Sequence, residues 1–356
     1  MIKIVIDLTP LYARKITGVE AYGIEFYLAL KKTSYEIYPI FRIENTLDNN
    51  PNTIIINHKS RLISENYTIP KILKYLKPSI AFFPIFPPPI NVYNIDGVKI
   101  VPTIHDLAFR YYTSTLSLKA RLYLLPKYNR ALKYSNSIIT ISNSVLMELK
   151  KETKVTLFNF GESISVSYKL HDFIFDATIL NKYSLQIEGY LISVSTLEPR
   201  KNIKYLLEVW KILYKQYPSL KLVLVGRHGW GNTSEYSVLL NELKDSIVFT
   251  GYVEHADLVN LYHYSKAFIL LSLYEGFGRT PLEALACETR VITSDIPVFR
   301  ENVGQEGCYV VLNDAEKAAL QIESYIMKNK VKRTWINDQW FNVMESNIIS
   351  NINKLL

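Results

Sequence analysis

The sequence predicts an α/β protein built from two doubly wound halves. Three observations predict this class. Apolar runs alternate with helical patterns, the alternation weakens once near the middle of the chain, and the length of 356 residues suits two domains. Strands that alternate with helices are typical of parallel sheets with helices on both faces. Such sheets bind ligands beyond the carboxyl ends of their strands, so two halves are expected to face a central cleft.

The first half of the chain carries the first alternating series. Apolar runs typical of strands, bounded by turn residues, lie at 2–8, 37–43, 53–56, 80–86, 99–104 and 137–141. Helical patterns separate these runs at 19–32, 61–76, 118–134 and 144–152. We predict a first Rossmann-like domain over residues 1–165.

The second half repeats this organisation after a break. The periodicity weakens over 161–188, which we interpret as the linker, with one short helix at 180–185. Strands are predicted at 190–194, 220–225, 247–250, 267–271 and 291–293, and helices at 202–217, 235–243, 257–264, 281–287 and 315–329. We predict a second Rossmann-like domain over 166–334 and a terminal helix at about 335–356.

The composition is that of a globular protein with a modest positive charge. Hydrophobic residues make up 48% and charged residues 21%, which excludes a fully disordered or fibrous chain. Lys and Arg number 41 against 33 acidic residues, a formal charge of +8. This excess favours an anionic partner, namely phosphates, nucleic acid or an acidic membrane surface, and composition does not choose among the three.

The expected compartment is the cytoplasm. Two cysteines, Cys287 and Cys308, cannot form a disulfide framework, and a reducing compartment is the default interpretation. We see no signal-peptide pattern at the start of the sequence. The longest apolar run, 267–273, is far shorter than the roughly 20 residues that a membrane span needs.

A glycine loop at 274–285 carries the strongest chemical pattern. Gly276 and Gly278 let the backbone turn tightly and approach a ligand, and the helix that follows offers free N–H groups to a phosphate. The carboxylates of Glu275 and Glu283 flank this loop, and a carboxylate is a natural acceptor for paired sugar hydroxyls. An alternative stays open, because 280–283 also reads as a helix capping box and Glu275 as a solvated loop residue.

A second candidate segment, at 193–202, also follows a strand and precedes a helix. Arg200 and Lys201 lie beside the helix start, where positive charge is mildly unfavourable for the helix dipole. An anionic ligand explains these cations better than helix stability does. A solvated basic turn is the alternative.

Together these segments resemble the retaining glycosyltransferases of family 4, which have the GT-B fold. The resemblance covers almost the whole chain and rests on six segments, each at a predicted strand-to-helix junction. They are Glu275–Glu283 as the E-x7-E motif, 198–202 as EPRKN, 103–107 as the HDL segment, 139–142, 225–227 and 250–253.

The resemblance implies a role for each matching residue. Glu283 would hold ribose hydroxyls, Glu275 the transferred sugar, and Arg200 and Lys201 the diphosphate, whose departing charge they would stabilise. Catalytic roles fall on Glu275, His105, Lys201 and Arg200. Donor-binding roles fall on Glu283, Gly276, Phe277, Gly278, Gly18, Thr196, Arg279, Gly226 and Arg227. Acceptor-binding residues stay unassigned.

The implied reaction is transfer of a hexosyl group, with mannosyl as one candidate, by front-face substitution with retention. The donor would be a GDP- or UDP-linked sugar, with no cofactor and no metal, and the acceptor a glycan or a lipid- or protein-linked group. The sequence departs from the family at Ser195 and Thr196, where many members have Gly-Arg, so Arg200 or Arg279 would substitute. Chains of this fold commonly end in a helix that crosses back to the first domain, here with Trp335, Trp340 and Phe341.

The segment 118–134 mixes five cations with Leu and Tyr, a pattern typical of helices that lie on anionic membranes. Peripheral contact with the inner membrane face is one interpretation, and an ordinary helix packed on the first sheet is the other.

Three rival functions are weighed against the glycosyltransferase. A hydrolysing nucleotide-sugar epimerase shares the architecture. A nicotinamide dehydrogenase is disfavoured, because the first predicted strand is followed by Thr9-Pro10 and not by a glycine fingerprint. A basic nucleic-acid-binding protein is also disfavoured, because the cations form no stripe interleaved with aromatic residues, and no nucleic-acid partner is expected.

Overall fold

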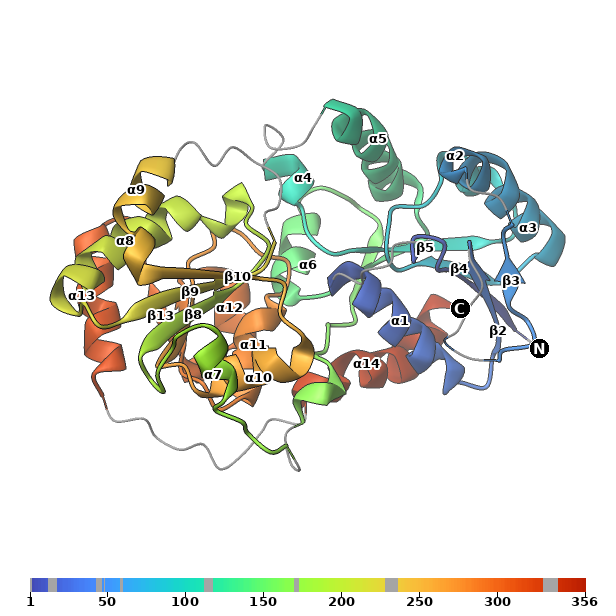
Figure 1. Ribbon diagram of the computed structural model, residues 1–356. Helices are drawn as coiled ribbons and strands as arrows, with labels where there is room; N and C mark the ends of the chain where they lie inside the picture. Colours follow the sequence, from blue (N-terminus) through green and yellow to red (C-terminus); the bar gives the residue numbers. More distant parts are fainter. Residues whose placement is uncertain are drawn as a thin grey trace. The chain divides into compact units, whose positions relative to one another are not determined.

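The computed structural model divides the chain into two compact units (Figure 1). It describes residues 2–11, 18–42, 47, 49–57, 60–111, 118–169, 173–227, 236–328 and 339–356. Unit 1 comprises Met1–Ser163 and Asn342–Leu356, and unit 2 comprises Ile164–Phe341. Each unit has one parallel sheet covered by helices, so the α/β class with two Rossmann-like halves is confirmed.

Unit 1 has a parallel sheet in the order β3-β2-β1-β4-β5-β6-β7. Its strands are β1 (Lys3–Asp7), β2 (Glu36–Phe41), β3 (Ile54–Ile55), β4 (Ile80–Phe83), β5 (Lys99–Ile104), β6 (Ser137–Thr140) and β7 (Thr156–Asn159). Its helices are α1 (Gly18–Lys31), α2 (Arg61–Ile63), α3 (Ile69–Leu76), α4 (Ala108–Tyr111), α5 (Leu118–Tyr134), α6 (Asn143–Leu149) and α14 (Gln339–Leu355). In Figure 1, α1 and α14 lie below this sheet, and α3 and α5 lie above it.

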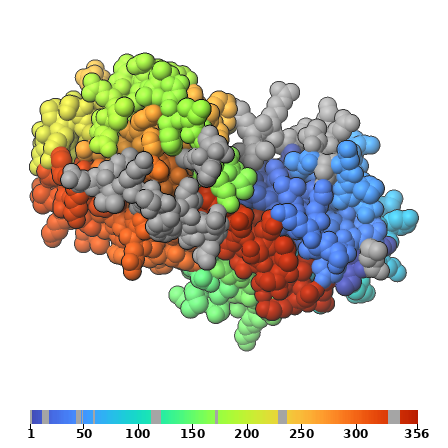
Figure 2. Space-filling view, turned by 90° about the horizontal axis from the view of Figure 1, so that it is seen from below, coloured from blue at the N-terminus to red at the C-terminus, as the bar shows by residue number. Residues whose placement is uncertain are grey.

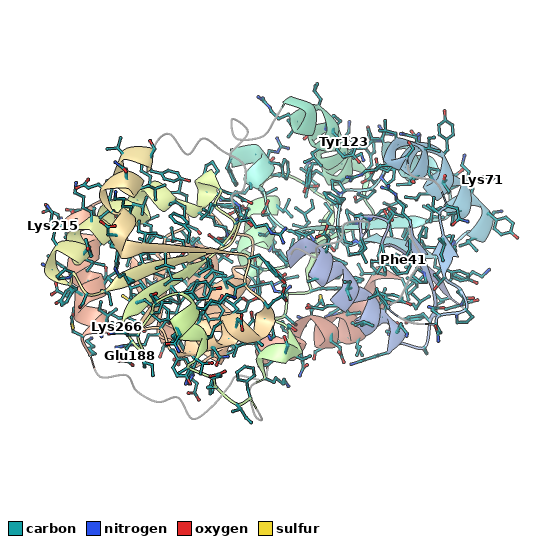
Figure 3. All side chains as sticks on the ribbon, viewed as in Figure 1. Phe41, Lys71, Tyr123, Glu188, Lys215 and Lys266 are labelled. Carbon is teal, nitrogen blue, oxygen red and sulfur yellow. The ribbon has the colours of Figure 1, made fainter. Side chains whose placement is uncertain are left out.

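The single helix predicted at 61–76 is wrong in one respect. A π-helical turn, Ser64–Thr68, separates α2 from α3. This turn holds Glu65, which is buried and accepts hydrogen bonds from Lys127 of α5 at 2.5 Å and from Tyr123, the α5 residue labelled in Figure 3. The extra residue per turn is a local departure from the 3.6-residue period that a sequence pattern assumes.

The same contact corrects the picture of α5 as a uniformly basic face. Lys127 is only 7% exposed, because its ammonium is committed to Glu65. Tyr128, the next residue of α5, stacks on Phe109 with ring centres 3.8 Å apart. The helix therefore packs on unit 1 through both residues, and Lys127 is not available to a membrane surface.

Unit 2 has a parallel sheet in the order β10-β9-β8-β11-β12-β13. Its strands are β8 (Tyr190–Val194), β9 (Lys221–Val225), β10 (Ile247–Gly251), β11 (Ala267–Leu270), β12 (Val291–Ser294) and β13 (Gly307–Val310). Its helices are α7 (Ile179–Lys182), α8 (Ile203–Gln216), α9 (Ser237–Glu242), α10 (His255–His263), α11 (Arg279–Ala286), α12 (Pro297–Asn302) and α13 (Ala315–Ile326). The sequence did not predict α4, β7, α12 or β13, which are short and carry no clear period.

The strand order of unit 2 reverses at β8, and this reversal positions the candidate site. The chain moves from β8 outward to β9 and β10, then returns to β11 on the other side of β8. Strands β8 and β11 pair directly, with Phe268 opposite Ile192. The loops that leave their carboxyl ends therefore lie side by side, at the point where open α/β sheets bind ligands.

The terminal helix α14 packs on unit 1, as the fold prediction required. Its Glu345 pairs with Lys32 at the end of α1, and its Asn347 donates to the backbone oxygen of Phe160 at 3.1 Å. Figure 2 shows the red α14 directly against the blue N-terminal segment. Phe341 is buried, whereas Trp335 lies outside the described residues.

Within the residues that the structure describes, no helix is both long enough and apolar enough to span a membrane.

Candidate active site

Two neighbouring loops form the candidate site of unit 2. The first follows β8 and contains a 3-10 turn, Pro199–Lys201, after which Asn202 adopts a left-handed conformation (φ 56°) and α8 begins. The second follows β11 and contains residues 271–278. A backbone hydrogen bond of 2.8 Å, from the Leu273 N–H to the Arg200 carbonyl, joins the two loops. The β8–β11 pairing thus brings together segments about 75 residues apart in the sequence.

The carboxylate of Glu275 lies at the centre of this site. Arg200 Nη1 donates to its Oε2 at 2.7 Å, and Lys201 Nζ donates to its Oε1 at 2.5 Å. The Ser272 hydroxyl donates to Oε1 at 2.8 Å. Arg200 is held further by its Nε, which donates to Glu198 at 2.9 Å. We call the Glu275, Arg200 and Lys201 side chains the Glu275 cluster.

The sequence patterns singled out the three members of the Glu275 cluster but did not predict that they bond to one another. The family resemblance implies a diphosphate as the partner of both cations and a sugar as the partner of Glu275. In the structure the cations are ordered by Glu275, which is only 7% exposed. Within the described residues, the hydrogen bond to Glu275 is the only one that Lys201 Nζ makes, and an ammonium has three donors. The cluster can therefore hold Lys201 in place and still offer N–H donors to an anion.

The charges of the Glu275 cluster are strongly coupled. Burial alone would raise the pKa of Glu275, but the Lys201 ammonium and the Arg200 guanidinium outweigh it and hold that pKa at about 2. Burial lowers the pKa of Lys201, with Arg200 acting in the same direction and Glu275 against it. Glu275 is thus a carboxylate at neutral pH, which makes it an anchor for the two cations and not a proton donor.

We predict a specific acid sensitivity from this cluster. A carboxyl whose pKa is depressed on folding contributes stability that is present above its ordinary pKa of 4.5 and is lost as the pH falls towards about 2. Glu275→Gln should therefore flatten the fall in unfolding free energy over this window, relative to wild type. Urea unfolding at several pH values measures it, and parallel curves for the two proteins would contradict the anchoring role.

The glycine loop ends in a residue that only glycine suits. Gly278 has φ 83°, and a Cβ there would lie 2.5 Å from the Phe299 ring. Gly278 is the N-cap of α11, so the helix begins at Arg279 and Thr280 lies inside it. The alternative interpretation of 280–283 as a capping box is therefore wrong. The neighbouring Phe277 is buried, and its carbonyl accepts a hydrogen bond from Asn302 at 2.7 Å.

Glu283 lies one turn into α11 and is held by two tyrosines. The hydroxyls of Tyr168 and Tyr262 donate to its Oε2 at 3.3 and 3.4 Å. Burial raises the pKa of Glu283, against the nearby Arg279 charge and the two hydroxyls. Both hydroxyls bond to Oε2, so Oε1 is the carboxylate oxygen that can accept a hydrogen bond from another donor. Neither tyrosine was singled out from the sequence, and their distance from Glu283 along the chain explains why.

Three further predicted donor residues surround the β8 loop. Gly226 follows β9 with φ 138°, and a Cβ there would lie 2.0 Å from the Ser195 carbonyl oxygen. Thr196 is exposed on the same loop, and the exposed Arg227 lies over the Tyr252 ring at 5.2 Å. Gly226 therefore has a structural reason for being glycine, because the backbone of the β8 loop passes directly over it.

Unit 1 holds the other two predicted residues. His105 follows β5, and its Nε2 lies 2.7 Å from the Pro84 carbonyl, an acceptor, so that nitrogen carries the proton. Burial lowers the pKa of His105, which favours the neutral ring with a free lone pair at Nδ1. Gly18 is the first residue of α1 and is exposed, while the predicted loop residues 12–17 before it lie outside the described residues.

Asp7 was not singled out from the sequence, and it ends β1 beside β4, where the strand order of unit 1 reverses. Burial raises the pKa of Asp7 to about 6, against a 3.0 Å hydrogen bond from the Thr9 N–H. The sequence signal that could have indicated Asp7 is a carboxylate at the end of an apolar run.

Comparison with known proteins identifies the class of unit 2. A family model described as glycosyl transferases group 1 matches residues 181–339, which hold the Glu275 cluster, Gly278 and Glu283. Unit 2 is a glycosyltransferase group 1 domain. The resemblance to glycosyltransferases drawn from the sequence is confirmed for this domain.

Curated relatives of the glycosyltransferase domain include two O-antigen mannosyltransferases. O-antigen chain mannosyltransferase B of Escherichia coli is 29% identical over 251 residues, 67% of this chain and 62% of that protein. RfbU of Salmonella typhimurium is 31% identical over 215 residues, 60% of this chain and 56% of that protein. The chain thus spans about three fifths of the length of these relatives.

Solved structures show that the fold extends over the whole chain. Anabaena HepE, in complex with UDP and glucose, superposes with a TM-score of 0.72 at 13% identity, covering 99% of this chain and 100% of that one. A glycosyltransferase from Rickettsia africae gives 0.68 at 18% identity, covering 99% and 98%. These likenesses confirm the GT-B fold.

Proposed function

We propose that this protein is a retaining glycosyltransferase that moves a hexosyl group from a nucleotide-diphosphate sugar to an acceptor. The Glu275 cluster carries the proposal, because it fixes two cations at the ligand-binding edge of a group 1 domain. The mannosyltransferase relatives favour mannosyl as the transferred group, and the UDP and glucose bound by HepE support a nucleotide-linked donor.

The proposed donor site uses three parts of unit 2. Glu283, with Oε2 held by Tyr168 and Tyr262, would accept the ribose hydroxyls at Oε1. The N–H groups at the start of α11, reached through the Gly278 turn, would meet the diphosphate. Lys201 and Arg200 would stabilise the charge that gathers on the diphosphate as the sugar leaves, which is where preorganised donors contribute most.

The proposed chemistry is front-face substitution without a protein nucleophile. The leaving phosphate oxygen would take the proton of the acceptor hydroxyl, so that the glycosidic bond to the donor breaks and the new one forms on the same face. Glu275 is already bonded to two cations and therefore serves as their anchor. Neutral His105, with Nδ1 as an acceptor, would receive a hydroxyl of the transferred sugar.

The acceptor side is proposed to lie on unit 1, at the carboxyl ends of its strands. The acceptor class is a glycan or a lipid- or protein-linked group, and the relatives named O-antigen chain mannosyltransferases favour a glycan. A cytoplasmic location and peripheral contact with a membrane belong to this proposal as well.

A panel of nucleotide sugars tests the donor site. GDP-mannose, GDP-glucose, UDP-glucose and UDP-N-acetylglucosamine are added to wild type, Glu283→Ala and Lys201→Ala, and the thermal midpoint is followed. One donor should raise the wild-type midpoint by several degrees, and both variants should lose most of that shift. No shift with any sugar would overturn the function, and equal shifts in all three proteins would overturn the site.

Product analysis tests the reaction. With the donor found in the panel and a glycan acceptor, the new linkage should keep the anomeric configuration of the donor, and EDTA should leave the rate unchanged. In the described residues no group of three or more potential metal ligands comes together. Release of free sugar without an acceptor, at a rate above transfer, would instead indicate the hydrolysing epimerase. Inversion, or loss of activity in EDTA, would contradict the mechanism.

A further inference from the structure

Unit 1 contains a cavity that the proposed reaction does not use. It has a volume of about 750 Å³ and lies where α4, the end of α5 and the segment after α6 meet. Arg110, Lys133, Lys150, Lys151 and Lys154 line it, with Glu152 as the one carboxylate in its lining. The volume is that of a small-molecule site.

The Arg110 side of the cavity is fixed. Arg110 Nη2 lies 3.4 Å from Glu152 and donates to Asn129 at 3.2 Å. The adjacent Phe109 stacks on Tyr128, which attaches α4 to α5. Glu152, the only acidic residue in the lining, is thus already paired with Arg110. No carboxylate of the lining is left to balance the charge of the four lysines.

The four lysines are exposed around the opening of this cavity. Within the part of the chain that the structure describes, none of them forms an ion pair. Four ammonium groups from two separate elements thus converge on one hollow. Their mutual repulsion is a cost that a bound anion would relieve.

Helix dipoles explain part of this charge but not all of it. Helices α5 and α6 both end beside the cavity, and each carboxyl terminus carries roughly half a negative charge, which lysines at the end of a helix offset. These two termini together balance about one lysine. About three positive charges are left, and Lys154 lies beyond the helix end.

We propose that this cavity binds a phosphate or diphosphate group. Ammonium and guanidinium donors in a concave site are the groups that bind phosphate oxygens. Such a group is present both in the headgroup of an anionic phospholipid and in free pyrophosphate. The site is distinct from the Glu275 cluster, because all its residues belong to unit 1 and the cluster belongs to unit 2.

The test uses the full chain with two probes and two charge-matched variants. The probes are inorganic pyrophosphate, followed by calorimetry with the nucleotide sugar found in the donor panel held at saturation so that it occupies the Glu275 cluster, and vesicles of phosphatidylglycerol in phosphatidylcholine, followed by sedimentation. The test variant is Lys151→Glu/Lys154→Glu. The control is Lys71→Glu/Lys74→Glu on α3, where both lysines are exposed and Lys71 is labelled in Figure 3.

Wild type should bind at least one probe, and the test variant should bind it about tenfold more weakly or worse, while the control stays within about twofold. A loss confined to vesicles assigns the site to lipid headgroups, and a loss for pyrophosphate assigns it to a soluble phosphate. Thermal midpoints equal to wild type show that both variants are folded. The proposal is overturned if wild type binds neither probe, or if the control variant loses as much binding as the test variant.

Discussion

Lys201→Ala is expected to lower the turnover number for glycosyl transfer by about 10²–10³-fold, the cost of one preorganised donor to developing negative charge. Lys201 lies 2.5 Å from Glu275 and is 11% exposed, so neither water nor another side chain readily replaces it. The diphosphate is more negative in the transition state than in the bound donor. Turnover should therefore fall more than donor affinity does. Initial rates at saturating and limiting donor measure the two effects separately.

Lys204→Ala is the matched control for this prediction. Lys204 lies three residues further along, in the first turn of α8, and is exposed. Its removal deletes the same charge from the same region of the chain without touching the Glu275 cluster, so turnover should stay within about twofold of wild type. A small loss in Lys201→Ala, or an equal loss in both variants, would show that Lys201 does not act on the diphosphate.

The composition of this site was predictable from the sequence, but its internal bonding was not. Arg200, Lys201 and Glu275 each stand after an apolar strand, which is a local pattern. The three side chains come together only because β8 pairs with β11. The periodicity of a sequence does not predict which strands pair. The sequence therefore indicated two cations and a carboxylate as separate ligand groups, and the topology made them one cluster.

Contacts between distant segments also explain why two predictions were wrong, the capping box at 280–283 and the fully basic face of α5. Glu283 fits a capping box in sequence, but the left-handed Gly278 starts α11 earlier and leaves Glu283 to Tyr168 and Tyr262. Lys127 reads as part of a basic helix face, but its partner Glu65 lies on a distant π-helical turn. In both cases a buried ionisable side chain bonds to a residue far away in the sequence, and local sequence patterns do not predict such contacts.

Gly226→Ala is expected to destabilise the protein by about 3 kcal/mol or more, well above the cost of a strained backbone conformation alone. The added Cβ would lie 2.0 Å from the Ser195 carbonyl oxygen, and φ 138° is strained for any residue with a side chain. Because the clash is with backbone, a rotamer change cannot relieve it. The β8 loop itself must move, and this loop carries Arg200 and Lys201. Donor binding should therefore weaken together with stability.

Gly251→Ala separates the clash from the backbone conformation. Gly251 accepts a hydrogen bond of 2.9 Å from the Gly226 N–H and has φ 68°, but a Cβ there meets nothing within 4 Å. Its replacement should cost only about 1 kcal/mol, the strain of a left-handed alanine, with the donor-induced thermal shift unchanged. Urea unfolding and the donor-induced shift of both variants measure the difference. A clash that displaces the β8 loop must make Gly226→Ala worse than Gly251→Ala both in unfolding free energy and in the donor-induced shift. If the two variants lose equally in both measurements, the close approach of the β8 loop to Gly226 does not position Arg200 and Lys201.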